Sequence, residues 1–205
     1  MSNIEELKRK ALELREQGLR TGEIADELNV SQDTVRWLIS RPKKDRSAPK
    51  DIFVDWSGVA SSPTRTQLTG FLLADYLEET LVGQEQPVEV VIGIAHSGIP
   101  LATSIAQEMG AALAIYQPPK RSATDDEGSN NFKGTFSKNF ASVEGRRCVI
   151  VDDVVTTGNT INGCIQQLKE LGAIPLACAV LVEKSGEPMA GDIPLLAMIR
   201  IGRLD

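Results

Sequence analysis

The segment that decides the fold is Cys148-Val-Ile-Val-Asp-Asp-Val-Val-Thr-Thr-Gly-Asn-Thr160. Its first four residues are apolar, as in a strand that is buried on both faces of a parallel sheet. Two aspartates come next, and a Thr/Gly turn then leads into the helical periodicity of residues 159–171. Ligands bind beyond the carboxyl ends of the strands in an open α/β sheet, so the segment predicts a binding turn between a strand and a helix.

The chain around this segment, from residue 51 onward, alternates short apolar runs with amphipathic stretches. The predicted strands are 88–94, 112–116, 148–151 and 176–182, and the predicted helices are 65–82, 98–109 and 159–171. This alternation indicates an α/β fold, an open parallel sheet with helices on both faces. Residues 117–140 hold prolines, small polar residues and the acidic run Asp125-Asp126-Glu127. Such a long loop in a compact domain is commonly functional or mobile.

The turn after the central strand suits a phosphate monoester. Backbone N–H groups at a helix N-terminus attract anions, and this turn also offers hydroxyl and amide groups from Thr156, Thr157, Gly158, Asn159 and Thr160. Asp152 and Asp153 precede it and can accept hydrogen bonds from the vicinal hydroxyls of a ribose, or help to hold a cation. The segment resembles the phosphoribosyl pyrophosphate signature of the type I phosphoribosyltransferases.

A second loop, in Ile92-Gly-Ile-Ala-His-Ser-Gly-Ile-Pro-Leu101, also runs from a strand into a helix. Its residues Ala95, His96, Ser97 and Gly98 resemble the loop by which this family holds pyrophosphate, mainly through the backbone. His96 is the only histidine, but the resemblance argues against a general base at this position. We therefore expect no catalytic residue and no resident metal. The one cofactor that the resemblance allows is Mg²⁺ accompanying the ligand.

The resemblance covers residues 51–205, whose loops are similar to those of orotate phosphoribosyltransferases. Residues 160–172 and 182–186 are more similar to purine operon repressors and xanthine phosphoribosyltransferases. The orotate enzymes present Lys and His to the leaving pyrophosphate, whereas residues 122–131 contain neither and carry the acidic run. Acidic groups near a developing pyrophosphate raise the barrier by repulsion, although Lys120, Arg121, Lys133 and Lys138 flank the run. The sequence thus favours ligand binding over transferase activity.

The first forty residues predict three short helices, of which the second and third match a helix-turn-helix over residues 21–40. Ala25 stands where the two helices touch, and the apolar positions are filled by Ile24, Leu28, Val30, Val35 and Leu38. Asn29 occupies the turn position that needs positive φ. Ser31 is the expected N-cap of the second helix of the motif.

A helix-turn-helix places its second helix in a DNA major groove. The predicted contacts to bases and phosphates come from Ser31, Gln32, Asp33, Arg36 and Trp37, and backbone contacts come from Arg41, Lys43 and Lys44. Trp37 is equally compatible with a core position. A three-helix cap of purely structural function is the alternative for the whole motif.

The distribution of charged residues also separates the first fifty residues from the rest of the chain. Residues 1–50 carry eleven Lys and Arg against nine Asp and Glu, whereas residues 51–205 carry eleven against nineteen. A basic module that faces a polyanion, joined to an acidic domain, fits this asymmetry, and so does a solvated linker. The predicted organisation is a helix-turn-helix domain at 1–41, a proline-containing linker at 42–50 and a phosphoribosyltransferase-like domain at 51–205.

Composition excludes several other classes of protein. No apolar run reaches the roughly 18 to 20 residues of a membrane span, and residues 1–18 lack the apolar core of a secretory signal. We therefore expect a cytoplasmic protein with no membrane partner. Cys148, Cys164 and Cys178 are odd in number and lack the spacing of a zinc site, which favours core positions over a disulfide framework.

A helix-turn-helix followed by a phosphoribosyltransferase-like domain is similar to a family of archaeal transcriptional regulators of central sugar catabolism. The resemblance implies a DNA-binding regulator that senses phosphoribosyl pyrophosphate or a related sugar phosphate. The alternatives are an active orotate or purine phosphoribosyltransferase and an RNA-binding attenuation-type regulator. Because one helix-turn-helix contacts only a few base pairs, we expect a homodimer on double-stranded DNA with an inverted repeat.

Overall fold

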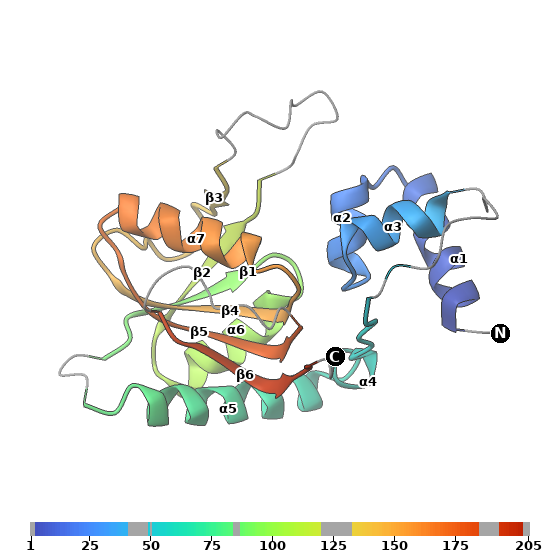
Figure 1. Cartoon of the computed structure of the whole chain (residues 1–205). Coiled ribbons are helices and arrows are strands. Elements are labelled where there is room, and N and C mark those ends of the chain that lie inside the picture. Colours follow the sequence, from blue (N-terminus) through green and yellow to red (C-terminus); the bar gives the residue numbers. More distant parts are fainter. Residues whose placement is uncertain are drawn as a thin grey trace. The chain divides into compact units, whose positions relative to one another are not determined.

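The computed structural model of the chain describes residues 3–40, 49, 51–83, 87–119, 133–184 and 193–202. The chain divides into two compact units, Met1–Trp56 and Ser57–Asp205 (Figure 1). In the described part of the chain, no helix has both the length and the apolar character needed to cross a membrane.

The first unit contains the three predicted helices, α1 (Asn3–Glu16), α2 (Thr21–Glu27) and α3 (Gln32–Ile39). Their apolar faces meet in one buried cluster, which is formed by Leu7, Ala11, Ile24, Ala25, Leu28, Val30, Val35 and Leu38. The apolar positions of the helix-turn-helix pattern are all in this cluster. The pattern therefore predicted the core of the unit correctly.

Residues that follow the predicted linker belong to the first unit. Asp51 accepts hydrogen bonds from the backbone N–H of Ser31 and the hydroxyl of Thr34, each at 2.7 Å. Phe53 packs against the helical cluster. The division between the units therefore falls after Trp56, whereas the sequence pattern places the start of the second domain at residue 51.

The second unit is built around a six-stranded sheet with the strand order β3-β2-β1-β4-β5-β6. Its elements, in chain order, are α4 (Ser57–Ala60), α5 (Pro63–Thr80), β1 (Val90–Ile94), α6 (Gly98–Glu108), β2 (Ala112–Gln117), β3 (Thr135–Phe136), β4 (Arg147–Val155), α7 (Asn159–Glu170), β5 (Ile174–Glu183) and β6 (Leu195–Arg200). All neighbouring strands are parallel except β2 and β3, which are antiparallel. The predicted open α/β sheet is confirmed, and the antiparallel pair makes it mostly rather than wholly parallel.

Helices cover both faces of this sheet. Figure 1 shows α7 on one face and α5 on the other, and α6 packs against α5, β1 and β4. Alternate strand residues point to opposite faces, so Val90, Ile92 and Ile94 join the cluster that contains Leu168 of α7. Burial on both faces explains why β1 is apolar along its whole length.

Three elements of the second unit were not predicted. They are the short helix α4, the two-residue strand β3 and the edge strand β6. The central strand β4 also runs four residues beyond its predicted end, to Val155. Val154 and Val155 are buried and pair with Val182 and Glu183 of β5, which keeps this part of the chain in the sheet.

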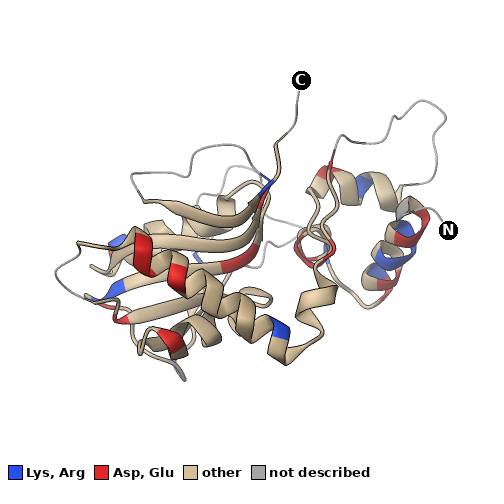
Figure 2. Ribbon diagram, turned by 90° about the horizontal axis from the view of Figure 1, so that it is seen from below, with Lys and Arg blue, Asp and Glu red and all other residues tan. Residues whose placement is uncertain are grey.

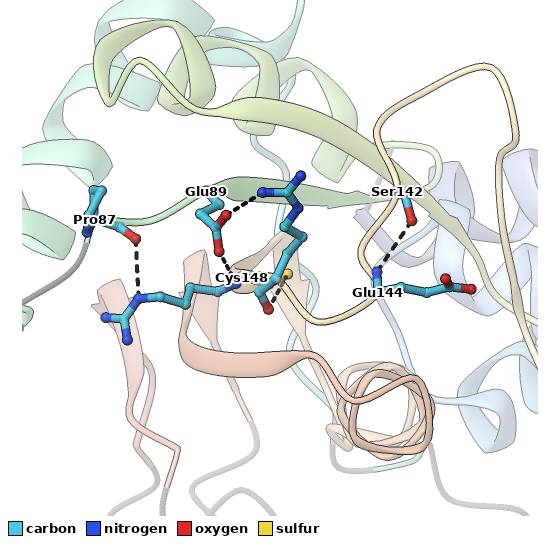
Figure 3. A network of polar contacts seen from close by, with 7 residues as sticks. Pro87, Glu89, Ser142, Glu144 and Cys148 are labelled. Atoms are coloured by element: carbon cyan, nitrogen blue, oxygen red, sulfur yellow. Dashed lines mark hydrogen bonds and ion pairs between the residues drawn. The ribbon is translucent and has the colours of Figure 1, made fainter.

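Glu89 joins β1 to β4 at the amino ends of these strands (Figure 3). Its carboxylate accepts a hydrogen bond from the backbone N–H of Arg147 at 3.0 Å and forms an ion pair with Arg146 at 2.5 Å. These contacts lower the pKa of Glu89, with the backbone hydrogen bond as the largest cause. The side chain of Arg147 also donates to the carbonyl of Pro87. This network fixes the alignment of the two central strands.

The three cysteines are free and fully buried. Burial raises the pKa of Cys148 and Cys178 to about 12 and raises that of Cys164 well above its ordinary value. The thiols are therefore protonated at neutral pH and serve as small apolar core residues.

Candidate functional site

The predicted ligand loops meet where the strand order reverses direction. From β1 the chain continues to β2 on one side, while β4 begins on the other side of β1. The two strands are parallel and in register, with Gly93 opposite Val151. Their carboxyl ends therefore lie side by side, at the position where open α/β sheets bind ligands.

A close backbone approach brings the two loops together. A Cβ atom placed on Gly98 would lie 2.5 Å from the carbonyl oxygen of Val151 and 3.2 Å from Oδ1 of Asp152. These distances leave no room for a side chain at position 98. Glycine at the start of α6 is thus required for the loop of residues 95–98 to rest against β4.

The turn before α7 has the geometry of an anion cradle. Gly158 has φ of +72° and precedes the first residue of the helix, Asn159, and glycine adopts this left-handed conformation without steric cost. The hydroxyl of Thr157 accepts a long hydrogen bond of 3.5 Å from the N–H of Asn159. The first N–H groups of a helix lack intrahelical partners, so this end of α7 presents donors to an anion.

The two aspartates stand inside β4 rather than after its end. Asp152 is half-buried, whereas Asp153 is only 4% exposed. The backbone N–H of Asp153 donates to Oδ1 of Asp152 at 2.9 Å. Successive strand residues point to opposite faces, so Asp152 and Asp153 are not equivalent, and Asp152 is the more accessible carboxylate.

In the other loop, of residues 95–98, backbone hydrogen bonds hold the chain and the side chains differ in exposure. The N–H of Ala95 donates to the carbonyl of Tyr116 at 2.9 Å, and the N–H of Ile99 donates to the carbonyl of His96. The peptide bond between Ala95 and His96 is cis. His96 is exposed, while Ala95 and Ser97 are half-buried.

The basic residues that flank the acidic run differ in position. Lys133 forms an ion pair with Glu170 at 2.5 Å. Glu170 is the last residue of α7, about 16 Å along the helix axis from the anion cradle at its first residue. Lys133 is therefore held away from the candidate ligand site. Lys138 is exposed, and Lys120, Arg121 and the acidic run lie outside the described residues.

Sequence patterns did not predict the contacts that hold the chain at Gly134, within the predicted loop of residues 117–140. The side chain of Gln167 in α7 donates to the carbonyl of Gly134 at 2.9 Å. Tyr116 is buried at the end of β2, and a Cβ atom on Gly134 would overlap its ring. Burial raises the pKa of Tyr116 to about 12. A small residue at 134 is therefore needed for the chain to return to the sheet at this point.

The first unit reproduces the local geometry predicted for the helix-turn-helix. Asn29 has φ of +52° in the turn. The side chain of Ser31 accepts a hydrogen bond from the N–H of Thr34 at 3.2 Å and caps α3. Both features were predicted from residue type alone.

The predicted DNA-contacting residues of α3 differ in exposure. Arg36 and Asp33 are exposed and form an ion pair at 2.9 Å. Gln32 is half-buried beside Gly22 of α2. Trp37 is half-buried and packs against the helical cluster, so part of its ring is committed to the core. Arg41, Lys43 and Lys44 lie outside the described residues.

Asp51 is a site residue that sequence reasoning missed. Its Oδ2 atom accepts from the N–H of Ser31 and the hydroxyl of Thr34, and its Oδ1 atom accepts from the N–H of Ile52. A carboxylate at a helix N-terminus also interacts favourably with the helix dipole. Ser31 is 20 residues away in sequence, so no local pattern could reveal this second cap of α3.

Across the described ranges, no group of three or more His, Cys, Asp or Glu side chains is arranged to hold a metal ion.

Comparison with known proteins identifies a domain family for the second unit and a protein family for the whole chain. The phosphoribosyl transferase domain family matches residues 55–199. The fold of the second unit is also found in orotate phosphoribosyltransferase from Aeropyrum pernix, with a TM-score of 0.52 and 22% identity over 75% of this chain and 80% of that one. This likeness concerns the fold alone.

Two relatives match the chain from end to end. Transcriptional regulator GfcR 1 of Methanosarcina barkeri is 50% identical over 207 residues, and transcriptional regulator GfcR of Methanocella arvoryzae is 44% identical over 207 residues. In both cases the match covers 100% of this chain and 100% of the relative. The chain therefore belongs to the archaeal GfcR family of transcriptional regulators and carries a phosphoribosyltransferase domain.

Proposed function

We propose that this regulator binds DNA through its first unit and senses phosphoribosyl pyrophosphate, or a related sugar phosphate, in its second unit. The observation that carries the proposal is the contact between Gly98 and the Val151–Asp152 backbone. It holds the loop of residues 95–98 against β4 at Asp152, four residues before the turn of residues 156–160, and this supports a ligand that spans both loops. Central sugar catabolism is the process that we propose it regulates, because the whole sequence resembles a family of regulators of that process.

The ligand would span both loops. Its 5′-phosphate would be bound by the turn of residues 156–160, its ribose hydroxyls by Asp152 and Asp153, and its pyrophosphate by residues 95–98. Mg²⁺ prefers oxygen ligands and keeps phosphate oxygens and waters around it. Among the described residues, the two loops offer the neighbouring carboxylates of Asp152 and Asp153, so we expect any Mg²⁺ to be held mainly by the oxygens of the ligand.

The DNA-binding part of the proposal rests on α3 and its caps. The exposed Arg36 would read base edges, while Lys43 and Lys44 would contact phosphates without contributing sequence information. A single α3 reaches only a few base pairs, which favours a homodimer on an inverted repeat.

Transferase activity is the second candidate function, and the ion pair of Lys133 with Glu170 argues against a role for this lysine at the pyrophosphate. We expect little or no transfer of phosphoribose to orotate. A turnover of order 1 per second or faster, the ordinary enzyme range, would contradict a regulator without catalysis.

Fluorescence anisotropy with labelled genomic fragments tests the proposed function directly. Binding is measured at fixed salt with and without phosphoribosyl pyrophosphate, because DNA affinity depends steeply on salt. The proposal predicts sequence-selective binding that the ligand changes. Ribose 5-phosphate and inorganic pyrophosphate serve as partial ligands, and an operator affinity that none of the three compounds alters would contradict the sensor.

A further inference from the structure

The outer face of α5 carries an apolar stripe that no described residue of the second unit covers. Leu68, Leu72 and Tyr76 are 56%, 57% and 38% exposed. They are spaced four residues apart and therefore lie on one side of the helix. The opposite side of α5 is buried, through Thr66, Gly70, Leu73, Ala74 and Leu77. Three large apolar side chains in a row at the surface indicate an interaction face.

Charges of opposite sign bracket this stripe. Arg65 and Glu79 are exposed, seven residues before and after Leu72. Within the described part of the chain, neither is in an ion pair. In Figure 2, α5 is seen from its outer side, with a basic band near the end that follows α4 and acidic bands toward its other end.

The arrangement is symmetric about Leu72. At about 100° per residue, Arg65 and Glu79 lie roughly 20° to either side of Leu72, and Leu68 and Tyr76 lie roughly 40° to either side. A two-fold axis through Leu72 would therefore place Leu72 against itself, Leu68 against Tyr76 and Arg65 against Glu79 of a second copy. Such self-complementarity is the requirement for a two-fold interface.

We propose that α5 is the homodimer interface of this protein, formed by antiparallel packing of two α5 helices across Leu72. The parallel arrangement would set Arg65 against Arg65 and Glu79 against Glu79, and like charges oppose it. In the antiparallel arrangement, Asp75 faces Thr69 of the second copy, so no like charges meet along the seam. The proposed DNA binding leads us to expect a homodimer. The outer face of α5 is then the surface through which this homodimer forms.

Sedimentation of the full chain without DNA tests the interface separately from DNA binding. We expect a dimer whose dissociation constant rises about tenfold or more on Leu72→Glu, as for a buried anchor residue. Ile174→Glu is the matched control, because Ile174 is similarly exposed at 49% but lies at the start of β5. Arg65→Glu and Glu79→Arg should each weaken the dimer, and the double variant should restore it.

Cysteine cross-linking tests the antiparallel register. Cys148, Cys164 and Cys178 are buried, so an exposed cysteine would form the only accessible disulfide. Leu72→Cys should cross-link to its own copy under mild oxidation. Leu68→Cys should not, since its two copies would stand about 12 Å apart along the axis, beyond the reach of a disulfide.

A monomer at micromolar concentration would overturn the proposal, and so would a dimer indifferent to both Leu72→Glu and the charge exchange. Equal cross-linking at positions 68 and 72 would overturn the antiparallel register. A dimer with the expected cross-link that binds no operator would leave the interface standing and contradict only the DNA-binding function.

Discussion

Asp51 shows how a single carboxylate supports the helix that is proposed to read DNA. Its two hydrogen bonds to Ser31 and Thr34 are 2.7 Å long, and they add to the cap that Ser31 itself provides. We expect Asp51→Ala to lower the stability of the first unit by about 1–2 kcal/mol, the usual cost of losing a helix cap. Denaturation followed by tryptophan fluorescence measures this, because both tryptophans, Trp37 and Trp56, belong to that unit.

Glu27→Ala is the matched control, since Glu27 is an exposed acidic residue at the end of α2. If Asp51→Ala unfolds at the same denaturant concentration as the wild type, the second cap has no structural role. Operator affinity should also fall in Asp51→Ala. The lost cap lies at the first turn of α3, which begins directly after Ser31 and is the helix proposed to read DNA.

Gly98 is the residue on which the ligand site depends most directly. The methyl group of Gly98→Ala would lie 2.5 Å from a backbone oxygen of β4, so the loop or the strand must shift. Overpacking of this kind costs about 1–3 kcal/mol, and we expect at least part of it as lost affinity for phosphoribosyl pyrophosphate in calorimetry. Gly58→Ala should bind as the wild type does, because no atom lies within 4 Å of a Cβ at position 58.

Residue-level prediction from sequence succeeded where the signal is local and failed where it is not. The Asn29 turn, the Ser31 cap and the glycine turn before α7 each follow from residue types that are adjacent in sequence. The Asp51 cap joins positions 20 residues apart. The contact of Gly98 with Asp152 depends on the parallel register of β1 and β4, which no single segment encodes.

At the scale of elements, the succession of apolar runs predicted β1, β2, β4 and β5, whose apolar residues are mostly buried. β6 was missed although its residues Leu195-Leu-Ala-Met-Ile199 form an apolar run like those of the predicted strands. It is an edge strand with one neighbour, β5. β3 has two residues, too few for any periodicity. β4 exceeds its predicted length because its two aspartates interrupt the apolar run, while backbone pairing with β5 continues past them.

The pairing of β1 with β4 should depend on pH through Glu89. Hydrogen bonding and the ion pair lower its folded pKa, so its contribution to stability is present above the unfolded pKa of about 4.3. This contribution is lost as the pH falls through the folded pKa. We therefore expect Glu89→Gln to be less stable than the wild type at pH 7, with a difference that shrinks on acidification below about pH 4.

Denaturant unfolding followed by far-ultraviolet circular dichroism at several pH values checks this dependence. Glu144→Gln is the control, because Glu144 is exposed at the turn before β4, and the contact with Ser142 drawn in Figure 3 is donated by its backbone N–H and not by its carboxyl group. A stability difference for Glu89→Gln that is constant from pH 7 to about pH 3 would show that the charge of Glu89 does not hold the strands.

The proposed reading helix α3 and the basic segment after it should contribute differently to DNA binding. Arg36 is exposed on α3, and we expect Arg36→Ala to cost about 1–3 kcal/mol on the operator while changing nonspecific binding little. Lys43→Ala with Lys44→Ala should weaken binding to every sequence and flatten its salt dependence. Anisotropy on operator and scrambled fragments over a salt series separates the two effects. Equal losses on both fragments for Arg36→Ala would show that α3 is not the reader.

At the scale of the whole molecule, the proposed function requires that ligand and operator affinity be coupled. A ligand shifts DNA affinity only by its differential affinity for the competent and incompetent states, typically about 1–3 kcal/mol, or roughly 5- to 150-fold. A short stretch of chain connects the two units and can carry this coupling. Asp51 caps α3 of the first unit, and α4 of the second unit begins six residues later, at Ser57. We expect phosphoribosyl pyrophosphate to change operator affinity within this range.

Asp152→Asn with Asp153→Asn should abolish this response and leave operator binding without ligand nearly intact. Both aspartates belong to the second unit, and asparagine keeps their size while it removes the charges that are proposed to accept from ribose hydroxyls. Calorimetry on the same variant separates lost binding from lost coupling. If the wild type binds the ligand but its operator affinity stays constant at saturation, the second unit is not the sensor. By reciprocity, operator DNA must change the ligand affinity of the wild type by the same factor, so the coupling can be measured from either side.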